Sequence, residues 1–260
     1  MSLALIQKLN AMLLAEMPEY RGQAAGVGET EEAQRNLLRA LMNVRPPLPL
    51  TEAFVRLQDE LLAAEREKHG VIDVTALSAV PSDERITLWQ GDITRLSADA
   101  IVNAANAALL GCFIPCHRCI DNAIHSAAGL QLRVECAALM ERQGHPEETG
   151  TAKITQGYNL PARHVIHTIG PIVSGALTDE HRELLASCYR SCLHLAAEHG
   201  LRSIVFCCIS TGEFHFPNKE AAEIAVREVR AFLAQNKSME RVVFNVFKDE
   251  DRMIYERLLS

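Results

Sequence analysis

The chain has 260 residues, 48% of them hydrophobic and 23% charged, which allows one large domain or one domain with a smaller extension. The formal net charge is -7, and no excess of Lys or Arg indicates an electrostatic surface for nucleic acid. No apolar run reaches the roughly 20 residues that span a bilayer, and Lys8 interrupts the apolar start. We therefore expect no membrane segment and no signal peptide, and we predict a cytoplasmic location.

Three helices are predicted within residues 1–78. The first ends at Pro18, the second begins at a Thr30 cap, and the third runs from Thr51 to a stop signal at Gly70. Apolar residues recur at helical spacing in each of them. Nothing in this part carries the residue types of catalytic chemistry, so we predict a helical N-terminal extension with a packing role.

Residues 79–260 alternate strands with helices. This alternation predicts an α/β fold in which a largely parallel sheet is covered by helices on both faces. The expected strands are Ile86–Gln90, Ala100–Val102, Ala152–Tyr158, His164–Thr168, Ser203–Ile209 and Arg241–Phe247, and the expected helices are Asp121–Ala128, Leu130–Arg142, Asp179–His199, Lys219–Gln235 and one at the carboxyl end.

Three polar segments follow predicted strands, and ligands of such sheets bind outside the carboxyl ends of the strands. In GDIT, Gly91 permits an unusual backbone angle, and Asp92 suits either a ligand amine or a cap for the next turn. The two Asn of NAAN (103–106) are poor strand or helix formers and suit fixed polar groups. STGEFHFP (210–217) has the Ser, Thr and Gly of a loop that presents N–H groups to phosphate. Each segment alone is weak, because ordinary turns contain the same residues.

A short loop before the helix at Asp121 holds possible metal ligands at Cys112, Cys116, His117 and Cys119. In a reducing compartment, such a Cys/His cluster favours metal over a disulfide. If the segment before the helix is extended, His117 and Cys119 point together and Cys116 points away. Three protein ligands leave an open position, as in catalytic zinc sites, whereas a fourth would make the site structural, and we favour three. The other cysteines are interpreted as small buried residues: Cys136, Cys188, Cys192, Cys207 and Cys208.

Taken in order, GDIT, NAAN, a modified glycine loop before DNAIHSAAG, VIHTIGP and STGEFHFP resemble the macrodomain family over about residues 83–260. The resemblance implies a three-layer α/β/α fold with a mixed, largely parallel sheet that binds ADP-ribose. It implies that Asp92 holds the adenine amine with Ile93 beside it, and that Asn106 contacts the distal ribose. It also implies a loop around the diphosphate and distal ribose, formed by Ser210, Thr211, Gly212, Glu213 and Phe214.

Where many macrodomains have a run of glycines, this chain has CFIPCHRC, which resembles the zinc-containing branch of the family. That resemblance implies Cys112, His117 and Cys119 as ligands of one Zn²⁺ per chain. It implies a protein-ADP-ribose hydrolase that acts on mono-ADP-ribosylated protein through an ester linkage to Asp or Glu. It also implies coupling to a sirtuin-type ADP-ribosyltransferase and a lipoyl-carrier protein. In this interpretation Asn106 fixes the ribose and Asp121 is the candidate general base.

Several interpretations stay open at this point. Asp121 also suits a helix N-terminus, where it opposes the dipole. His125 is expected to be a hydrogen-bonded buried residue, His167 a structural one and His215 a solvated one, while Glu213 is expected to face the zinc pocket. The alternative functions are a non-catalytic ADP-ribose reader, an O-acetyl-ADP-ribose deacetylase and, against the acidic charge, a nucleic-acid module with a zinc knuckle.

Overall fold

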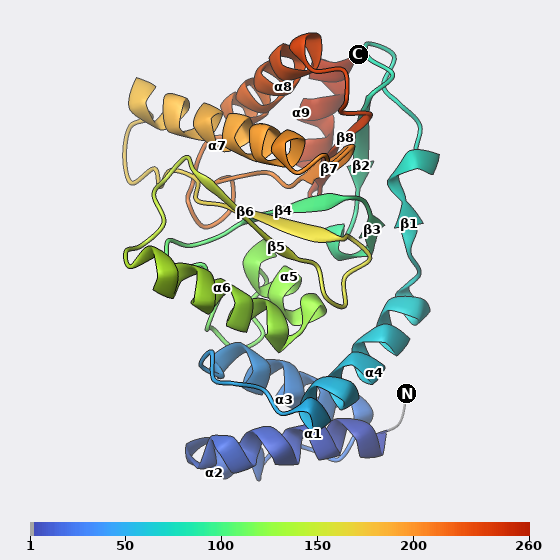
Figure 1. The fold of residues 1–260 in the computed structure, drawn as a ribbon, viewed down its shortest axis with the longest axis vertical. Helices are drawn as coiled ribbons and strands as arrows, with labels where there is room; N and C mark the ends of the chain where they lie inside the picture. Colours follow the sequence, from blue (N-terminus) through green and yellow to red (C-terminus); the bar gives the residue numbers. More distant parts are fainter. Residues whose placement is uncertain (1–2) are drawn as a thin grey trace.

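A computed structural model describes residues 3–260, so residues 1 and 2 of the predicted extension lie outside it. Its first part is helical, as predicted, and forms a separate layer at the bottom of Figure 1. Thr30 and Thr51 cap their helices by accepting the N–H groups of Ala33 and Phe54, each at 3.2 Å. The helices are α1 (Leu3–Glu16), α2 (Arg21–Ala24), α3 (Glu31–Val44) and α4 (Glu52–His69).

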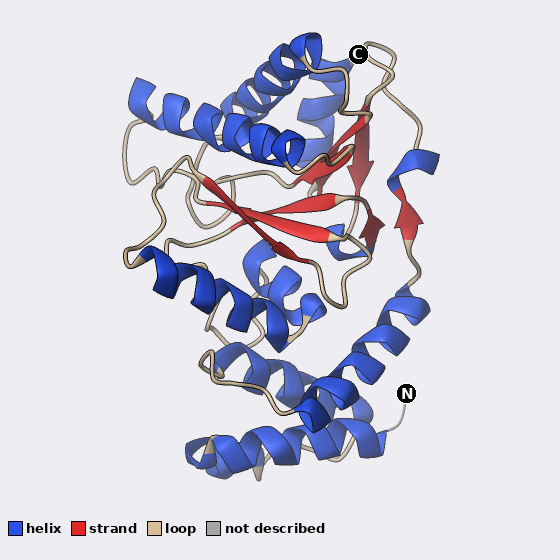
Figure 2. Ribbon diagram, in the orientation of Figure 1, coloured by secondary structure: helices blue, strands red, loops and turns tan. Residues whose placement is uncertain are grey.

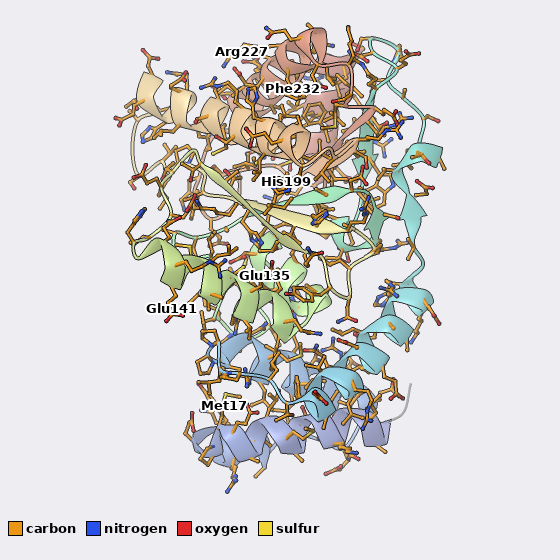
Figure 3. All side chains as sticks on the ribbon, in the orientation of Figure 1. Met17, Glu135, Glu141, His199, Arg227 and Phe232 are labelled. Atoms are coloured by element: carbon orange, nitrogen blue, oxygen red, sulfur yellow. The ribbon has the colours of Figure 1, made fainter. Side chains whose placement is uncertain are left out.

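This helical segment has an apolar cluster of its own. Met17, labelled in Figure 3, belongs to it together with residues of α1, α3 and α4. Leu130, at the start of the later helix α6 (Leu130–Gln143), completes the cluster. The segment therefore packs against the remainder of the chain through α6, and the division near residue 78 stays a prediction.

The second part contains a six-stranded sheet in the order β2-β8-β7-β4-β6-β5. Every neighbouring pair is parallel except β5 and β6, so the sheet is mixed and largely parallel, as predicted. A separate parallel pair joins β1 (Ile72–Asp73) to β3 (Leu96–Ser97). The strands of the large sheet are β2 (Ile86–Gln90), β4 (Ala100–Ala104), β5 (Ala152–Gln156), β6 (His164–Thr168), β7 (Ser203–Phe206) and β8 (Arg241–Val246).

Helices cover both faces of this sheet, which gives the predicted three layers (Figure 2). α5 (Ile120–Ala128) and α6 lie on the face toward the N-terminal helices. The other face carries α7 (Asp179–Glu198), α8 (Asn218–Gln235) and α9 (Asp249–Leu259). None of the helices within residues 3–260 is both long enough and apolar enough to cross a bilayer.

Three strands end earlier than predicted, and one ends later. β8 ends at Val246 instead of Phe247, whereas β4 continues to Ala104 instead of ending at Val102, so Asn103 of the NAAN segment lies within a strand. β5 ends at Gln156 instead of Tyr158, because Tyr158 has a φ of 51° and cannot continue an extended chain. β7 ends at Phe206 instead of Ile209, because the chain turns there and the N–H of Thr211 bonds to the carbonyl of Cys208. All these differences lie at the carboxyl ends of strands, where the chain leaves the sheet.

Candidate active site

A cavity of about 780 Å³ lies at the carboxyl ends of β2, β4, β7 and β8, within the size range of small-molecule sites. Every site residue predicted from the sequence lines this one cavity. These residues are Asp92, Ile93, Asn106, Cys112, His117, Cys119, Asp121, Ser210, Thr211, Gly212, Glu213 and Phe214.

The segment after β2 forms one end of the cavity. Asp92 is exposed, and its Oδ1 accepts a hydrogen bond from the N–H of Thr94 at 2.9 Å. Asp92 therefore caps the turn that follows it. Gly91 has a φ of 154°, and a Cβ there would lie 2.5 Å from the ring of Trp89. The Asn245 side chain fixes this turn by donating to the carbonyl of Gly91 at 3.0 Å. The backbone is therefore held in a form that only glycine fits.

Sequence reasoning missed a fourth segment of the cavity wall, which begins at the end of β8 and continues into α9. Asn245, Phe247, Lys248 and Asp251 all line the cavity, and Phe247 is 77% exposed. The sequence could have indicated this segment. Arg241–Phe247 is a predicted strand, and in a parallel sheet its carboxyl end must lie at the same edge as the ends of the other strands.

The loop before α5 brings three possible metal donors together. The donor atoms of Cys112, His117 and Cys119 all lie within 4.8 Å of one another, and Cys112 Sγ is 3.5 Å from His117 Nδ1. Cys116 is exposed, and its Sγ faces the backbone carbonyl of Asn36 on α3 at 3.5 Å. Cys116 is therefore outside the cluster. The reason differs from the expected one, because the chain is not extended here: Cys116 has a left-handed φ of 54°.

The chemistry of this donor set fits zinc. Two cysteine sulfurs and one imidazole are typical zinc ligands, and three protein ligands leave a coordination position open. Cys119 caps α5, where its Sγ accepts the N–H of Asn122 at 3.4 Å. Burial raises the pKa of the Cys119 thiol to about 12, and the N–H of Asn122 acts in the opposite direction. A divalent cation among the three donors would favour the thiolate strongly.

Glu213 faces this cluster from the loop after β7. Its Oε1 lies 3.7 Å from His117 Nε2, while the Nδ1 of the same ring faces Cys112. A histidine that binds a metal through one ring nitrogen commonly offers the other nitrogen to a carboxylate. The Glu213 side chain is thus turned toward the predicted ligand, as expected.

Asp121 and the two Asn of the NAAN segment form a polar group beside the cluster. Asp121 is 5% exposed; its Oδ1 accepts from Asn103 at 2.8 Å, and its Oδ2 lies 3.4 Å from Asn106 Nδ2. Burial raises the pKa of Asp121 to about 6, against the opposing effects of Asn103 and Arg133. Asn106 also donates to the carbonyl of Gly111 at 3.1 Å, so its amide is oriented at the cavity wall.

Two histidines lie in the core behind Asp121, and the first of them is His167. It is fully buried, with Nδ1 3.2 Å from Asn103 and Nε2 2.9 Å from Thr155. Both ring nitrogens therefore have polar partners inside the protein, which makes His167 structural, as predicted.

The second histidine, His125, is also buried, but neither of its ring nitrogens has a hydrogen-bond partner among residues 3–260. The expected hydrogen bond is therefore wrong, although Nε2 lies 3.5 Å from Asp121 Oδ1. Gly111 packs against the His125 ring so closely that a Cβ there would lie 2.8 Å from it. The donor atoms of His125, Cys136 and His167 also cluster, but both nitrogens of His167 are already engaged.

The buried His167 makes stability depend on pH. Burial lowers its pKa from 6.5 to about 3, so the unfolded state binds a proton that the folded state does not. The contribution of His167 to the free energy of unfolding is therefore full above pH 6.5 and is lost as the pH falls toward 3. Between pH 7 and pH 5 the loss is about 2 kcal/mol. Urea unfolding at both pH values should show this extra loss in the wild type relative to His167→Gln, and equal losses would contradict the assignment.

The comparisons with known proteins agree with this geometry. Residues 102–225 match the Macro domain family. A protein-ADP-ribose hydrolase of Treponema medium is 51% identical over 250 residues, which cover 95% of each chain. A protein-ADP-ribose hydrolase of Staphylococcus aureus (strain MSSA476) is 50% identical over 225 residues, 86% of this chain and 84% of that one.

Solved structures show the same fold. The Trypanosoma brucei macrodomain in complex with ADP-ribose has a TM-score of 0.67 and 33% identity, and the match covers 85% of this chain and 95% of that one. The Oceanobacillus iheyensis macrodomain with ADP has a TM-score of 0.59 and 40% identity, over 65% of this chain and 87% of that one. From the motifs, the sheet order, the cavity and these similarities, we conclude that the chain belongs to the macrodomain family.

Proposed function

We propose that this protein is a zinc-dependent hydrolase of the zinc-containing macrodomain branch that removes mono-ADP-ribose from modified protein side chains. The observation that carries the proposal is the cluster of Cys112, His117 and Cys119 at the wall of a cavity that also holds Asn106 and Asp121. The names of the relatives that are about half identical support the hydrolase part. An ester linkage to Asp or Glu is the proposed bond.

Binding of ADP-ribose is assigned to the two ends of the cavity. Asp92 holds the adenine amine with Ile93 beside it. The loop formed by Ser210 to Phe214 surrounds the diphosphate, and its Ser210 has a left-handed φ of 64° that curls the loop. Asn106 fixes the distal ribose next to the cysteine cluster. Such positioning supplies a large part of an enzyme's rate enhancement without a strong nucleophile.

The reaction is hydrolysis of the ester between the distal ribose and the side-chain carboxyl group, in which water is consumed and ADP-ribose and the free Asp or Glu carboxyl group are released. Asp121 accepts the proton of the attacking water, since its carboxylate lines the cavity beside Asn106. Glu213 orients the His117 ring from the loop after β7. Zinc, when bound, supplies a Lewis acid that polarises and orients the group at the distal ribose. The sirtuin-type transferase and the lipoyl-carrier protein stay predicted partners.

The test is the metal content of the purified protein, with hydrolysis of a mono-ADP-ribosylated protein measured before and after chelation. About one zinc per chain, with activity lost on chelation and restored by zinc while circular dichroism is unchanged, is the expected result. Chelation that unfolds the protein would make the zinc structural. A protein without zinc or hydrolysis that still binds ADP-ribose would be a reader, and the proposal would fail.

The substrate class is tested by turnover of an ester-linked protein substrate beside O-acetyl-ADP-ribose under the same conditions. We expect the modified protein to be turned over faster. Faster turnover of the small ester would make the protein a deacetylase and would overturn the proposed substrate class.

A further inference from the structure

Helix α3 of the N-terminal segment contacts the loop that carries the predicted zinc ligands. We infer that Arg39 and Asn43 are positioning residues, which hold residues 114–117 in the turn that brings His117 to the two cysteines. The inference rests on the proposed metal site. It gives the helical segment a second role besides packing, because the ligand loop alone does not fix its own shape.

The loop reverses direction at residues 114–117. The N–H of His117 bonds to the carbonyl of Ile114 at 3.2 Å, with Pro115 second and Cys116 third in the turn. Cys116 has a φ of 54°, which is the left-handed region. Proline at the second position and a positive φ at the third define a type II turn. A residue with a Cβ opposes this conformation, so a cysteine here needs outside support.

Asn43 supplies that support from α3. Its Oδ1 accepts the N–H of Cys116 at 2.9 Å, and its Nδ2 donates to Ser126 on α5 at 3.1 Å. Type I and type II turns differ by a flip of the peptide between the second and third residues. That peptide carries the Cys116 N–H, so a flip would break the bond to Asn43. Asn43 is 2% exposed, and a lost partner there would not be replaced by bulk water.

Arg39, one helical turn before Asn43, holds the far end of the turn. Its Nη2 donates to the carbonyl of His117 at 3.2 Å and to Asn122 Oδ1 at 2.8 Å. Asn122 in turn donates from Nδ2 to the carbonyl of Ile114 at 3.1 Å. Both carbonyls at the ends of the turn are thereby fixed, directly or through Asn122. The spacing of four residues places Arg39 and Asn43 on one face of α3.

The test compares Asn43→Ala and Arg39→Met with two controls from the same segment. Asn10→Ala removes a buried amide that bonds to Gln34, and Arg35→Met removes an arginine that pairs with Glu65. Zinc affinity is measured by competition with a chromophoric chelator, and the sulfur-to-metal absorption bands are recorded with Co²⁺. We expect about 10- to 100-fold weaker zinc binding and altered Co²⁺ bands in the two test variants. The controls should match the wild type.

A rescue experiment separates positioning from general stability. Glycine adopts a positive φ without strain, so Cys116→Gly should keep the turn when Asn43 is absent. The double variant Asn43→Ala/Cys116→Gly is therefore expected to bind zinc more tightly than Asn43→Ala alone. If Asn43→Ala does not fold, Arg39→Met, at a less buried position, carries the comparison.

The outcomes distinguish this inference from the proposed function. If the wild type binds zinc and the test variants bind it as tightly as the controls do, the positioning role is wrong. Failure of Cys116→Gly to improve on Asn43→Ala also overturns it. If the wild type itself takes up no zinc or Co²⁺, the proposed metal site fails, whatever the variants do.

Discussion

Replacing Cys112 with Ala is expected to lower the rate of hydrolysis of a mono-ADP-ribosylated protein by at least about 100-fold. A metal that acts as a Lewis acid stabilises the transition state by several kcal/mol. Each loss of about 1.4 kcal/mol in this stabilisation lowers the rate about tenfold. The variant leaves two of the three clustered donors, His117 and Cys119. It should still bind ADP-ribose, since the proposed adenine and diphosphate contacts lie after β2 and β7. Initial rates and calorimetric titration of ADP-ribose measure the two effects separately.

Cys116→Ala is the matched control for this loss. Cys116 lies in the same loop but outside the donor cluster, and alanine keeps the Cβ at its left-handed backbone. We expect it to retain activity within about twofold, because loss of an exposed thiol costs little. Equal loss in both variants would point to collapse of the loop. Full activity in Cys112→Ala would remove Cys112 from the reaction.

Replacing Arg133 with Met should have the largest effect on stability. Arg133 lies on α6 and is 2% exposed. Its Nε donates to the carbonyl of Leu110 at 2.7 Å, and its Nη1 donates to the carbonyls of Met42, Asn43 and Arg45 at 2.6–2.9 Å. Burial lowers the pKa of this guanidinium to about 10, so it is charged at neutral pH. It therefore caps the end of α3 and the start of the ligand loop together.

The expected loss is about 3 kcal/mol or more, because hydrogen bonds from a charged donor contribute about 1.5–3 kcal/mol each and the acceptors are left without a partner. Methionine keeps much of the volume, so the loss reports on the hydrogen bonds and on the stacking over Phe113 at 4.3 Å. Urea unfolding followed by circular dichroism gives the free energy of unfolding. Arg142→Met, on an exposed position of the same helix, should change it little. A similar small change in Arg133→Met would contradict this role.

The fold could be predicted because its signals are local. The Thr30 and Thr51 caps and the Gly70 stop lie where the helices begin and end, and the alternation of strands with helices requires a covered parallel sheet. The cavity lining was predictable for the same reason, since the strand ends of a parallel sheet converge at one edge. The set of Cys112, His117 and Cys119 was implied by the resemblance of CFIPCHRC to the zinc-containing branch, and the structure brings these three side chains together.

The features of the site that could not be predicted depend on contacts between distant parts of the chain. Arg39 and Asn43 reach residues more than 70 positions away, and an arginine and an asparagine on a helix carry no sequence signal of that. Arg133 could be placed on a helix, but its three carbonyl acceptors at the end of α3 could not. The hydrogen bond expected of His125 was wrong, because the sequence does not show which polar groups the fold places within reach of a buried ring.

The turn at residues 114–117 has a consequence for transplantation of this loop. Its left-handed cysteine is supported by Asn43, and its outer carbonyl by Arg39, both from a helix outside the three-layer fold. A macrodomain with an ordinary glycine run has no need of such a helix, since glycines adopt that backbone unaided. Grafting CFIPCHRC alone into such a protein would transfer the donors without their scaffold. The loop and α3 would therefore have to be transferred together, although about 70 residues separate them in the sequence.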